Sequence, residues 1–159
     1  MIEARGNLWK FEPTAMDSEA TRLLRCITTN GATRKDAAAV MGRGCAAEAK
    51  EILPGIEYRL GRLLQEHGNR VMRLCALDDG SHLASFPVKH HWREQADLEL
   101  IERSAHQLVE LANKFGYRPI LPRPGCGNGG RSYTREVKPL LERVVNSQPT
   151  PEILIENWS

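Results

Sequence analysis

Two glycine-rich stretches decide how this sequence is interpreted: residues 40–47, Val-Met-Gly-Arg-Gly-Cys-Ala-Ala, and residues 122–130, Pro-Arg-Pro-Gly-Cys-Gly-Asn-Gly-Gly. Each lies between an apolar run and a pattern typical of a helix. Glycine has no Cβ atom, so its backbone can adopt positive φ and lie directly against a ligand. A helix that begins just after such a loop adds a partial positive charge that attracts anions. A single glycine cluster is most simply a tight turn, but two such loops predict the two sides of a nucleotide-type cleft.

The apolar periodicity around these loops predicts strands that alternate with helices. Strands are expected at residues 6–11, 23–29, 71–77, 82–86, 118–121 and 152–156. Helices are expected at residues 45–53, 56–68, 98–115 and 137–145, with a flexible loop after Asn30-Gly31. Asp97 and Gly116 are the expected cap and stop of the long third helix. This order is typical of a three-layer α/β domain, in which ligands bind beyond the carboxyl ends of the strands. Both glycine loops fall there.

Length and composition restrict the class of protein. The 159 residues predict one domain, and the 41% hydrophobic and 26% charged content is typical of a soluble globular protein. No apolar run reaches membrane-spanning length and the first residues lack a signal-peptide pattern, so we expect a cytoplasmic protein. The four widely spaced cysteines are expected to be reduced thiols. No metal is expected, because only His90 and His91 pair at a spacing suited to ligands.

The basic residues are unevenly distributed, although the formal net charge of +2 is too small to indicate a nucleic-acid scaffold by itself. Many of them fall in or beside the two glycine loops. These are Arg34, Lys35, Arg43, Lys89, His90, His91, Arg93, Arg123 and Arg131. This bias favours an anionic ligand.

Five segments, in this order, resemble those of a macrodomain, the α/β module that binds ADP-ribose. They are Gly6-Asn7-Leu8, residues 27–31 (Ile-Thr-Thr-Asn-Gly), residues 39–44 (Ala-Val-Met-Gly-Arg-Gly), Phe86-Pro87-Val88-Lys89 and residues 122–130. Together they span nearly the whole chain. They are most similar to the branch that contains the DNA ADP-ribosyl glycohydrolase antitoxins, the terminal ADP-ribose protein glycohydrolase and phage-borne relatives. The resemblance implies one α/β/α macrodomain over residues 1–159, with a mixed sheet of about six strands and no cofactor.

The resemblance also assigns ligand contacts. The loop Met41, Gly42, Arg43, Gly44 and Cys45 would hold the diphosphate and the distal ribose, and Asn30 would lie near that ribose. The second loop would close over the phosphates from the other side through Pro124, Gly125, Cys126, Gly127, Asn128, Gly129 and Gly130. Asn7 takes the place of an aspartate that reads adenine in many macrodomains, and its amide is a weaker match for the exocyclic amine.

Lys89 is the position that separates a binder from an enzyme. In the glycohydrolase branch the lysine that ends this strand is implicated in attack on the anomeric carbon of the distal ribose. Attack requires a neutral amine, whereas lysine ordinarily titrates near pH ~10.4. Burial and nearby cations such as Arg93 or Arg123 would favour the neutral form. The alternative is a lysine that pairs with phosphate as a point charge.

The sequence departs from the protein-directed glycohydrolase at one position. That enzyme has a catalytic aspartate two residues after its Gly-Cys-Gly, where this chain has Gly129. The Asn-Gly-Gly form resembles the DNA-directed antitoxins, and it leaves the proton acceptor for Lys89 unidentified. Cys126 is interpreted as a small apolar filler, Tyr133 as a flank of the distal ribose or a helix cap, and Trp92 as a stacking residue or a cover for the core edge.

Three functions follow as hypotheses. The first is a hydrolase that removes ADP-ribose from DNA or protein with Lys89. The second is a non-catalytic reader or scavenger of ADP-ribose, favoured by the missing aspartate at residue 129. The third is a nucleic-acid-binding module that uses the basic loops and Trp92. In each of the first two, we expect a monomer whose partner is ADP-ribose or an ADP-ribosylated macromolecule, without a membrane role.

Overall fold

The computed structural model describes residues 1–12 and 22–157, and these form a six-stranded mixed sheet. The strands are β1 (Ile2–Arg5), β2 (Arg22–Asn30), β3 (Met72–Ala76), β4 (His82–Lys89), β5 (Tyr117–Pro122) and β6 (Leu154–Asn157), in the spatial order β1-β6-β5-β2-β4-β3. Neighbouring strands run parallel except β3, which pairs antiparallel with β4. The predicted mixed sheet of about six strands is confirmed.

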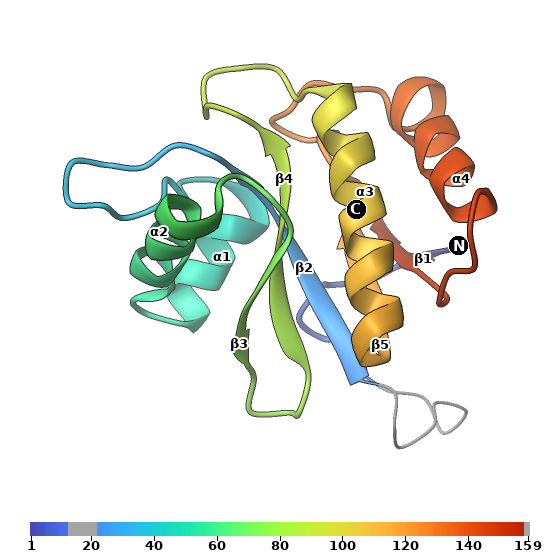
Figure 1. Cartoon of the computed structure of the whole chain (residues 1–159), viewed down its shortest axis with the longest axis horizontal. Coiled ribbons are helices and arrows are strands. Elements are labelled where there is room, and N and C mark those ends of the chain that lie inside the picture. Colours follow the sequence, from blue (N-terminus) through green and yellow to red (C-terminus); the bar gives the residue numbers. More distant parts are fainter. Residues whose placement is uncertain (13–21, 158–159) are drawn as a thin grey trace.

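Helices cover both faces of the sheet, as Figure 1 shows. Helices α1 (Gly44–Ile52) and α2 (Ile56–His67) lie on one face, and α3 (Leu98–Phe115) and α4 (Lys138–Asn146) lie on the other. Side chains alternate between the two faces of a strand, so β2 supplies both cores. Leu24 and Cys26 join the core under α3 and α4, whereas Leu23 and Ile27 join the core under α1 and α2. The three-layer α/β/α prediction is therefore confirmed.

The ends of α3 follow the predicted signals. The Asp97 carboxylate accepts hydrogen bonds from the backbone N–H groups of Glu99 (2.9 Å) and Leu100 (3.4 Å), and Gly116 ends the helix at φ +72°. A π-helical turn at Tyr133–Val137 precedes α4, and Pro139 occupies its first turn, where a missing N–H costs no helical bond. None of the helices in the described part of the chain combines the length and apolar composition that a membrane-spanning segment needs.

The prediction of a strand at residues 6–11 is wrong, because the edge strand is β1 instead. The Asn7 side chain accepts a hydrogen bond from the Trp9 N–H and the Asn7 carbonyl accepts one from the Lys10 N–H, both at 2.9 Å, which closes a turn. The buried Arg25 guanidinium then donates to the Leu8 carbonyl (2.7 Å) and to that of Phe11 (2.5 Å). These carbonyls are bound to a side chain and not to a strand ladder.

The segment after Asn30-Gly31, predicted as a flexible loop, is tied to α2. The Ala39 N–H donates to the Glu57 carbonyl (2.8 Å), and the Tyr58 hydroxyl donates to the Asp36 carboxylate (3.2 Å). Gly61 of α2 is required here, because a Cβ atom at this position would overlap the Ala37 carbonyl. These contacts fix the path of residues 31–38 beside the carboxyl end of β2.

Candidate functional site

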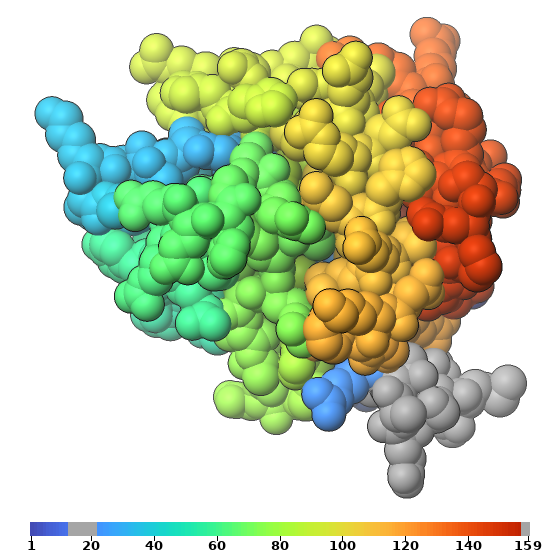
Figure 2. Space-filling view, in the orientation of Figure 1, coloured from blue at the N-terminus to red at the C-terminus, as the bar shows by residue number. Residues whose placement is uncertain are grey.

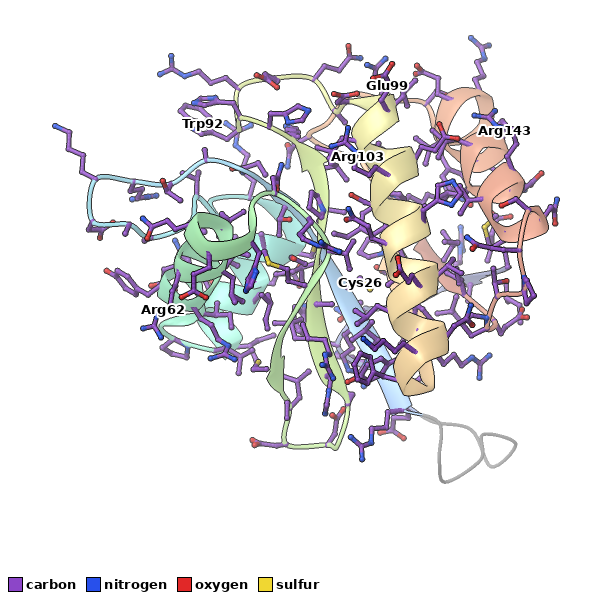
Figure 3. The ribbon with its side chains drawn as sticks, viewed as in Figure 1. Cys26, Arg62, Trp92, Glu99, Arg103 and Arg143 are labelled. Carbon is purple, nitrogen blue, oxygen red and sulfur yellow. The ribbon has the colours of Figure 1, made fainter. Side chains whose placement is uncertain are left out.

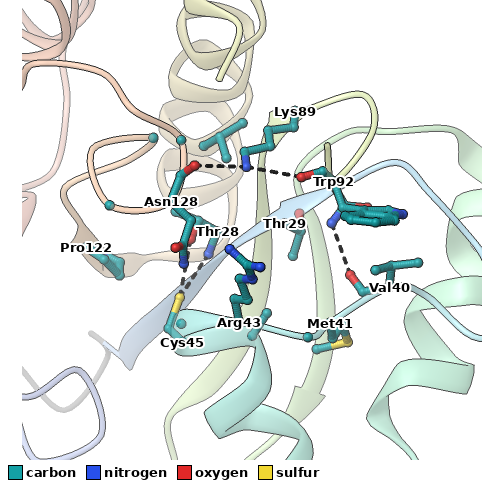
Figure 4. Close-up of a pocket in the computed structure, with 18 of the residues that line it drawn as sticks. Thr28, Thr29, Val40, Met41, Arg43, Cys45, Lys89, Trp92, Pro122 and Asn128 are labelled. Atoms are coloured by element: carbon teal, nitrogen blue, oxygen red, sulfur yellow. Dashed lines mark hydrogen bonds between the residues drawn. The ribbon is translucent and has the colours of Figure 1, made fainter. Parts of the chain in front are cut away.

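A cavity of about 1130 Å³ opens where β2, β4 and β5 end, between the two glycine loops. Figure 4 shows its centre, with Lys89 and Arg43 on facing walls. Most of the predicted site residues line it: Asn30, Met41, Gly42, Arg43, Gly44, Cys45, Lys89, Gly125, Cys126, Gly127, Asn128 and Gly129. Asn7, Pro124 and Gly130 do not line it. Asn7 has its side-chain oxygen bound to the Trp9 N–H, in the turn that follows β1.

The first glycine loop presents bare backbone to this cavity. Helix α1 begins at Gly44 with φ +59°, and its N-cap Arg43 makes no side-chain capping bond. A Cβ atom built on Gly42 or on Gly44 would meet no other atom within 4 Å. The first-turn N–H groups of a helix lack intrahelical acceptors and attract anions. The loop therefore offers both space and donors for a negatively charged group.

Cys45 fixes this loop to β2 from below. Its Sγ atom lies 3.3 Å from the Thr28 backbone N–H nitrogen, which donates to it, and 3.4 Å from the Thr28 hydroxyl. Burial raises the pKa of the Cys45 thiol, so the group stays protonated at neutral pH. Cys45 packs the start of α1 and is no nucleophile in this state.

The second glycine loop is packed against its own backbone and against side chains at the start of α3. Gly125 has φ +74°, and a Cβ atom there would lie 2.7 Å from the Ala96 Cβ. A Cβ atom on Gly129 would overlap the carbonyl group of Gly125. Only at Gly127 would an added Cβ find no atom within 4 Å. This loop conformation leaves no room for an aspartate side chain at residue 129.

Cys126 has the properties of a packing residue, as the sequence indicated. Its thiol donates to the Pro124 carbonyl at 3.4 Å. Burial raises the pKa of Cys126 to about 11. The thiolate, which is the nucleophilic form, is therefore scarce at neutral pH.

Lys89 ends β4 and directs its amine into the cavity. The Nζ atom donates to the backbone carbonyls of Asn128 (3.3 Å) and Trp92 (3.4 Å), which Figure 4 marks. Burial lowers the pKa of Lys89, and the positive charge of Arg43 lowers it further. The amine is thus held at one place, and its neutral form is more accessible than that of an exposed lysine.

The cations expected to act on Lys89 are engaged elsewhere. The Arg93 guanidinium lies 4.7 Å from the centre of the Trp92 ring, and that of Arg123 lies 4.3 Å from the centre of the Tyr133 ring. We expected Arg93 or Arg123 to lower the pKa of Lys89, but the cation that lowers it is Arg43. The Gly-Arg-Gly motif contained the signal, because a residue between two cavity-lining glycines must itself lie at the cavity.

The cavity wall contains no Asp, Glu or His among the residues that the structure describes. His90 is bound to the α3 cap, with its Nε2 atom 2.9 Å from the Asp97 carboxylate. His91 stacks on Trp92 with 5.4 Å between ring centres. In the same described ranges, no three His, Cys, Asp or Glu side chains gather as metal ligands would.

Several cavity residues were not assigned as ligand contacts from the sequence, although most of them lie within the quoted segments and Arg34 and Arg131 were among the basic residues named there. These are Thr28, Thr29, Thr33, Arg34, Val40, Ala46, Val88, Pro122 and Arg131. Thr28 and Thr29 precede the last residue of β2, so their place at the end of a predicted strand was an available signal. Trp92 and Tyr133 also line the cavity, and Trp92 is 44% exposed, so it does not cover the core edge.

Below the first loop lies a buried carboxyl group that the sequence did not single out. Glu156 on β6 is 1% exposed, and neither of its carboxylate oxygens has a hydrogen-bond partner among the described residues. Burial, and then the negative charge of Glu48 on α1, raises the pKa of Glu156 to about 7. An ionised carboxylate is therefore unfavourable between β6 and α1.

Comparison with known proteins agrees with this architecture. The macrodomain of Thermus aquaticus DarG superposes with a TM-score of 0.73 and 25% identity, covering 98% of this chain and 97% of that one. The protein has the macrodomain fold. A DNA ADP-ribosyl glycohydrolase from Thermus aquaticus is 26% identical to this macrodomain over 157 residues, 95% of this chain and 39% of the relative. The chain thus spans about two fifths of that relative. No protein-family model matches the sequence.

A second similar structure contains a ligand. Thermosipho africanus DarTG in complex with ADP-ribose matches this macrodomain with a TM-score of 0.67 and 22% identity. The match covers 87% of this chain and 38% of that one.

Proposed function

We propose that this macrodomain binds ADP-ribose in the cavity and hydrolyses an ADP-ribosyl linkage to DNA, with Lys89 as the catalytic residue. The observation that carries the proposal is the Lys89 amine, held between two carbonyls on the wall opposite the first glycine loop. The similarity to a DNA ADP-ribosyl glycohydrolase and to an ADP-ribose complex supports the ligand class. We further propose that residues 1–159 form a single macrodomain that acts as a monomer.

The shape and charge of the cavity suit a diphosphate between two sugars. The N-terminus of α1 and the uncovered backbone at Gly42 and Gly44 supply N–H donors. Arg34 and Arg43 supply positive charge from the same walls, whereas the Arg131 guanidinium is paired with the Glu136 carboxylate at 3.1 Å. With the diphosphate against this loop, the distal ribose would lie toward Asn30 and Lys89, where β2 and β4 end side by side.

Two hydrogen bonds orient the Lys89 amine for attack. A neutral amine that donates both N–H bonds, to Asn128 and to Trp92, keeps its lone pair free for a third direction. We propose that this lone pair forms a C–N bond with the anomeric carbon while the glycosidic bond breaks, its electron pair leaving with the base. The ribose ring then opens to an imine, and water releases ADP-ribose and restores the amine.

The proton balance assigns a role to the leaving group. The amine loses a proton when the C–N bond forms, and the described cavity wall has no carboxylate or imidazole to accept it. We propose that this proton passes to the departing group, directly or through water. Residue 129 has no room for an acidic side chain, because a Cβ atom there would overlap the Gly125 carbonyl group.

A lysine substitution tests the catalytic role. Lys89→Ala is expected to abolish release of ADP-ribose from an ADP-ribosylated oligonucleotide while calorimetry still detects ADP-ribose binding. Lys114→Ala, at the far end of α3 and outside the cavity wall, is the matched control and should keep wild-type turnover. Persistent turnover in Lys89→Ala would remove Lys89 from the chemistry, and wild-type binding without turnover would leave only a reader.

A non-catalytic ADP-ribose reader is the second candidate function. The observation that favours it is the absence of an acid or imidazole on the described cavity wall. It predicts that wild type and Lys89→Ala bind ADP-ribose alike and that neither cleaves a DNA or protein linkage. Failure of the wild type to bind ADP-ribose in calorimetry would reject both candidates.

A further inference from the structure

Three consecutive side chains form a stack on the rim of the cavity. The rings of His91 and Trp92 are 5.4 Å apart with an interplanar angle of 29°, and the Arg93 guanidinium lies 4.7 Å from the centre of the Trp92 ring. These residues are exposed, and Trp92 also lines the cavity. Figure 3 places Trp92 on the loop between β4 and α3, on the side away from α3. We call these three residues the rim stack.

The rim stack adjoins the proposed reaction centre. The Lys89 amine donates to the Trp92 carbonyl at 3.4 Å, so the backbone of the stack touches the group that would attack the anomeric carbon. If Lys89 attacks that carbon, the departing group leaves from the face of the carbon away from the amine, and everything attached to it must leave through the mouth of the cavity, which Trp92 lines. The rim stack therefore faces the macromolecule that carries the ADP-ribosyl group and not the ADP-ribose alone.

Cations flank the stack from the facing loop, although the exposed Glu94 directly follows Arg93. Arg34 lines the same cavity from the opposite loop, and Lys35 next to it is exposed. Figure 2 shows this segment (light blue) projecting beside the yellow-green segment that contains the rim stack. The nearest acid of that loop, Asp36, accepts the Tyr58 hydroxyl. Aromatic and guanidinium planes flanked by cations suit bases joined by phosphates.

We propose that the rim stack binds a nucleobase of the single-stranded nucleic acid that carries the ADP-ribosyl group. The base extends the row of planes formed by His91, Trp92 and Arg93, while the cations of the facing loop lie along the phosphates. Recognition of this kind needs unpaired bases, because a base in a duplex has both faces covered. This inference rests on the proposed function, and it assigns the rim stack a positioning role.

The test compares two ligands in the inactive Lys89→Ala background. Trp92→Ala is expected to weaken binding of an ADP-ribosylated single-stranded oligonucleotide about tenfold, the typical consequence of losing one stacked base, and binding of free ADP-ribose less than about twofold. Trp92→Phe should restore most of the difference, since it keeps an aromatic plane. Phe115→Ala is the matched control, because Phe115 is 43% exposed against 44% for Trp92 and lies outside the cavity wall.

Three results would overturn the inference. Equal losses for both ligands would place Trp92 in the ADP-ribose site itself. If Trp92→Ala weakens binding of an ADP-ribosylated peptide as much as binding of the oligonucleotide, the rim stack has no preference for bases. An unmodified single-stranded oligonucleotide is also expected to bind weakly, and more weakly to Trp92→Ala. If Trp92→Ala leaves the binding of both oligonucleotides unchanged, the inference is overturned. This outcome can be read even if the wild type fails to bind ADP-ribose, so the inference and the proposed function can fail separately.

Discussion

The two glycine loops have similar compositions and opposite surroundings. At Gly42 and Gly44 an added Cβ would enter open cavity, whereas at Gly125 and Gly129 it would strike the loop's own chain or α3. The glycines of the first loop therefore leave room for a ligand, whereas Gly125 and Gly129 of the second loop are required by the packing of the fold. A glycine required by packing and one required by a ligand look alike in sequence, but substitutions separate them through stability and binding.

The largest expected effect is on the second loop. Gly129→Asp, which restores the residue of the protein-directed enzyme, forces a side chain into the Gly125 carbonyl group. We expect a loss of about 3 kcal/mol or more in the free energy of unfolding, measured by denaturant titration. Gly127→Asp is the control in the same loop. A fully stable Gly129→Asp protein would mean that the two glycine loops do not differ as described.

The next effect concerns the buried carboxyl group under the first loop. The pKa of Glu156 is about 7 in the folded protein and ordinarily 4.5, so the folded state retains a proton that the unfolded chain loses. Stability is therefore expected to fall as the pH rises from about 4.5 to about 7 and then to level off. Glu156→Gln should remove this fall and gain about 2 kcal/mol at pH 8. Parallel pH–stability curves for the two proteins would contradict the assignment.

The third effect separates binding from stability in the first loop. Gly42→Val is expected to weaken ADP-ribose binding at least tenfold in calorimetry, because the side chain fills the space proposed for the ligand. Its free energy of unfolding should change by less than about 0.5 kcal/mol, as no atom is displaced. Gly44→Val should abolish binding too, but it should also cost about 1 kcal/mol of stability, because Gly44 has φ +59°. Unchanged binding in both variants would move the ligand away from this loop.

The smallest effect is expected at Gly127. Gly127→Ala adds a methyl group where no atom lies within 4 Å and where φ is not in the left-handed region. The free energy of unfolding should stay equal or rise by about 0.5 kcal/mol, since alanine restricts the unfolded chain. Thermal unfolding of Gly127→Ala and Gly129→Ala in parallel measures the contrast. A loss of more than about 1 kcal/mol in the free energy of unfolding of Gly127→Ala would show that Gly127 is also packed.

Sequence reasoning reached the layers, the sheet and most of the cavity wall because these depend on local patterns. The alternation in β2, the cap at Asp97 and the stop at Gly116 are readable within a few residues. The strand predicted at residues 6–11 failed because its carbonyls bind Arg25, which is 14 and 17 residues away and buried on β2. No pattern of hydrophobicity signals a buried arginine.

The electrostatics of the site was harder to predict than its outline. Proximity in sequence suggested Arg93 as the cation acting on Lys89, but the Arg93 side chain stacks on Trp92 and Arg43 approaches from another loop. Direction of side chains on irregular loops depends on such tertiary contacts. For the same reason Glu156, an ordinary residue of a terminal strand in sequence, appeared as a buried carboxyl group only in the fold.

The most direct test of the central claim, that the Lys89 amine attacks the distal ribose, is chemical trapping. Borohydride added during turnover of an ADP-ribosylated oligonucleotide reduces an imine to a stable secondary amine. Peptide mass spectrometry should then find the ADP-ribose adduct on Lys89, and the Lys89→Ala protein should carry none. Continued turnover with no adduct at Lys89, or with the adduct on another lysine, would contradict the account.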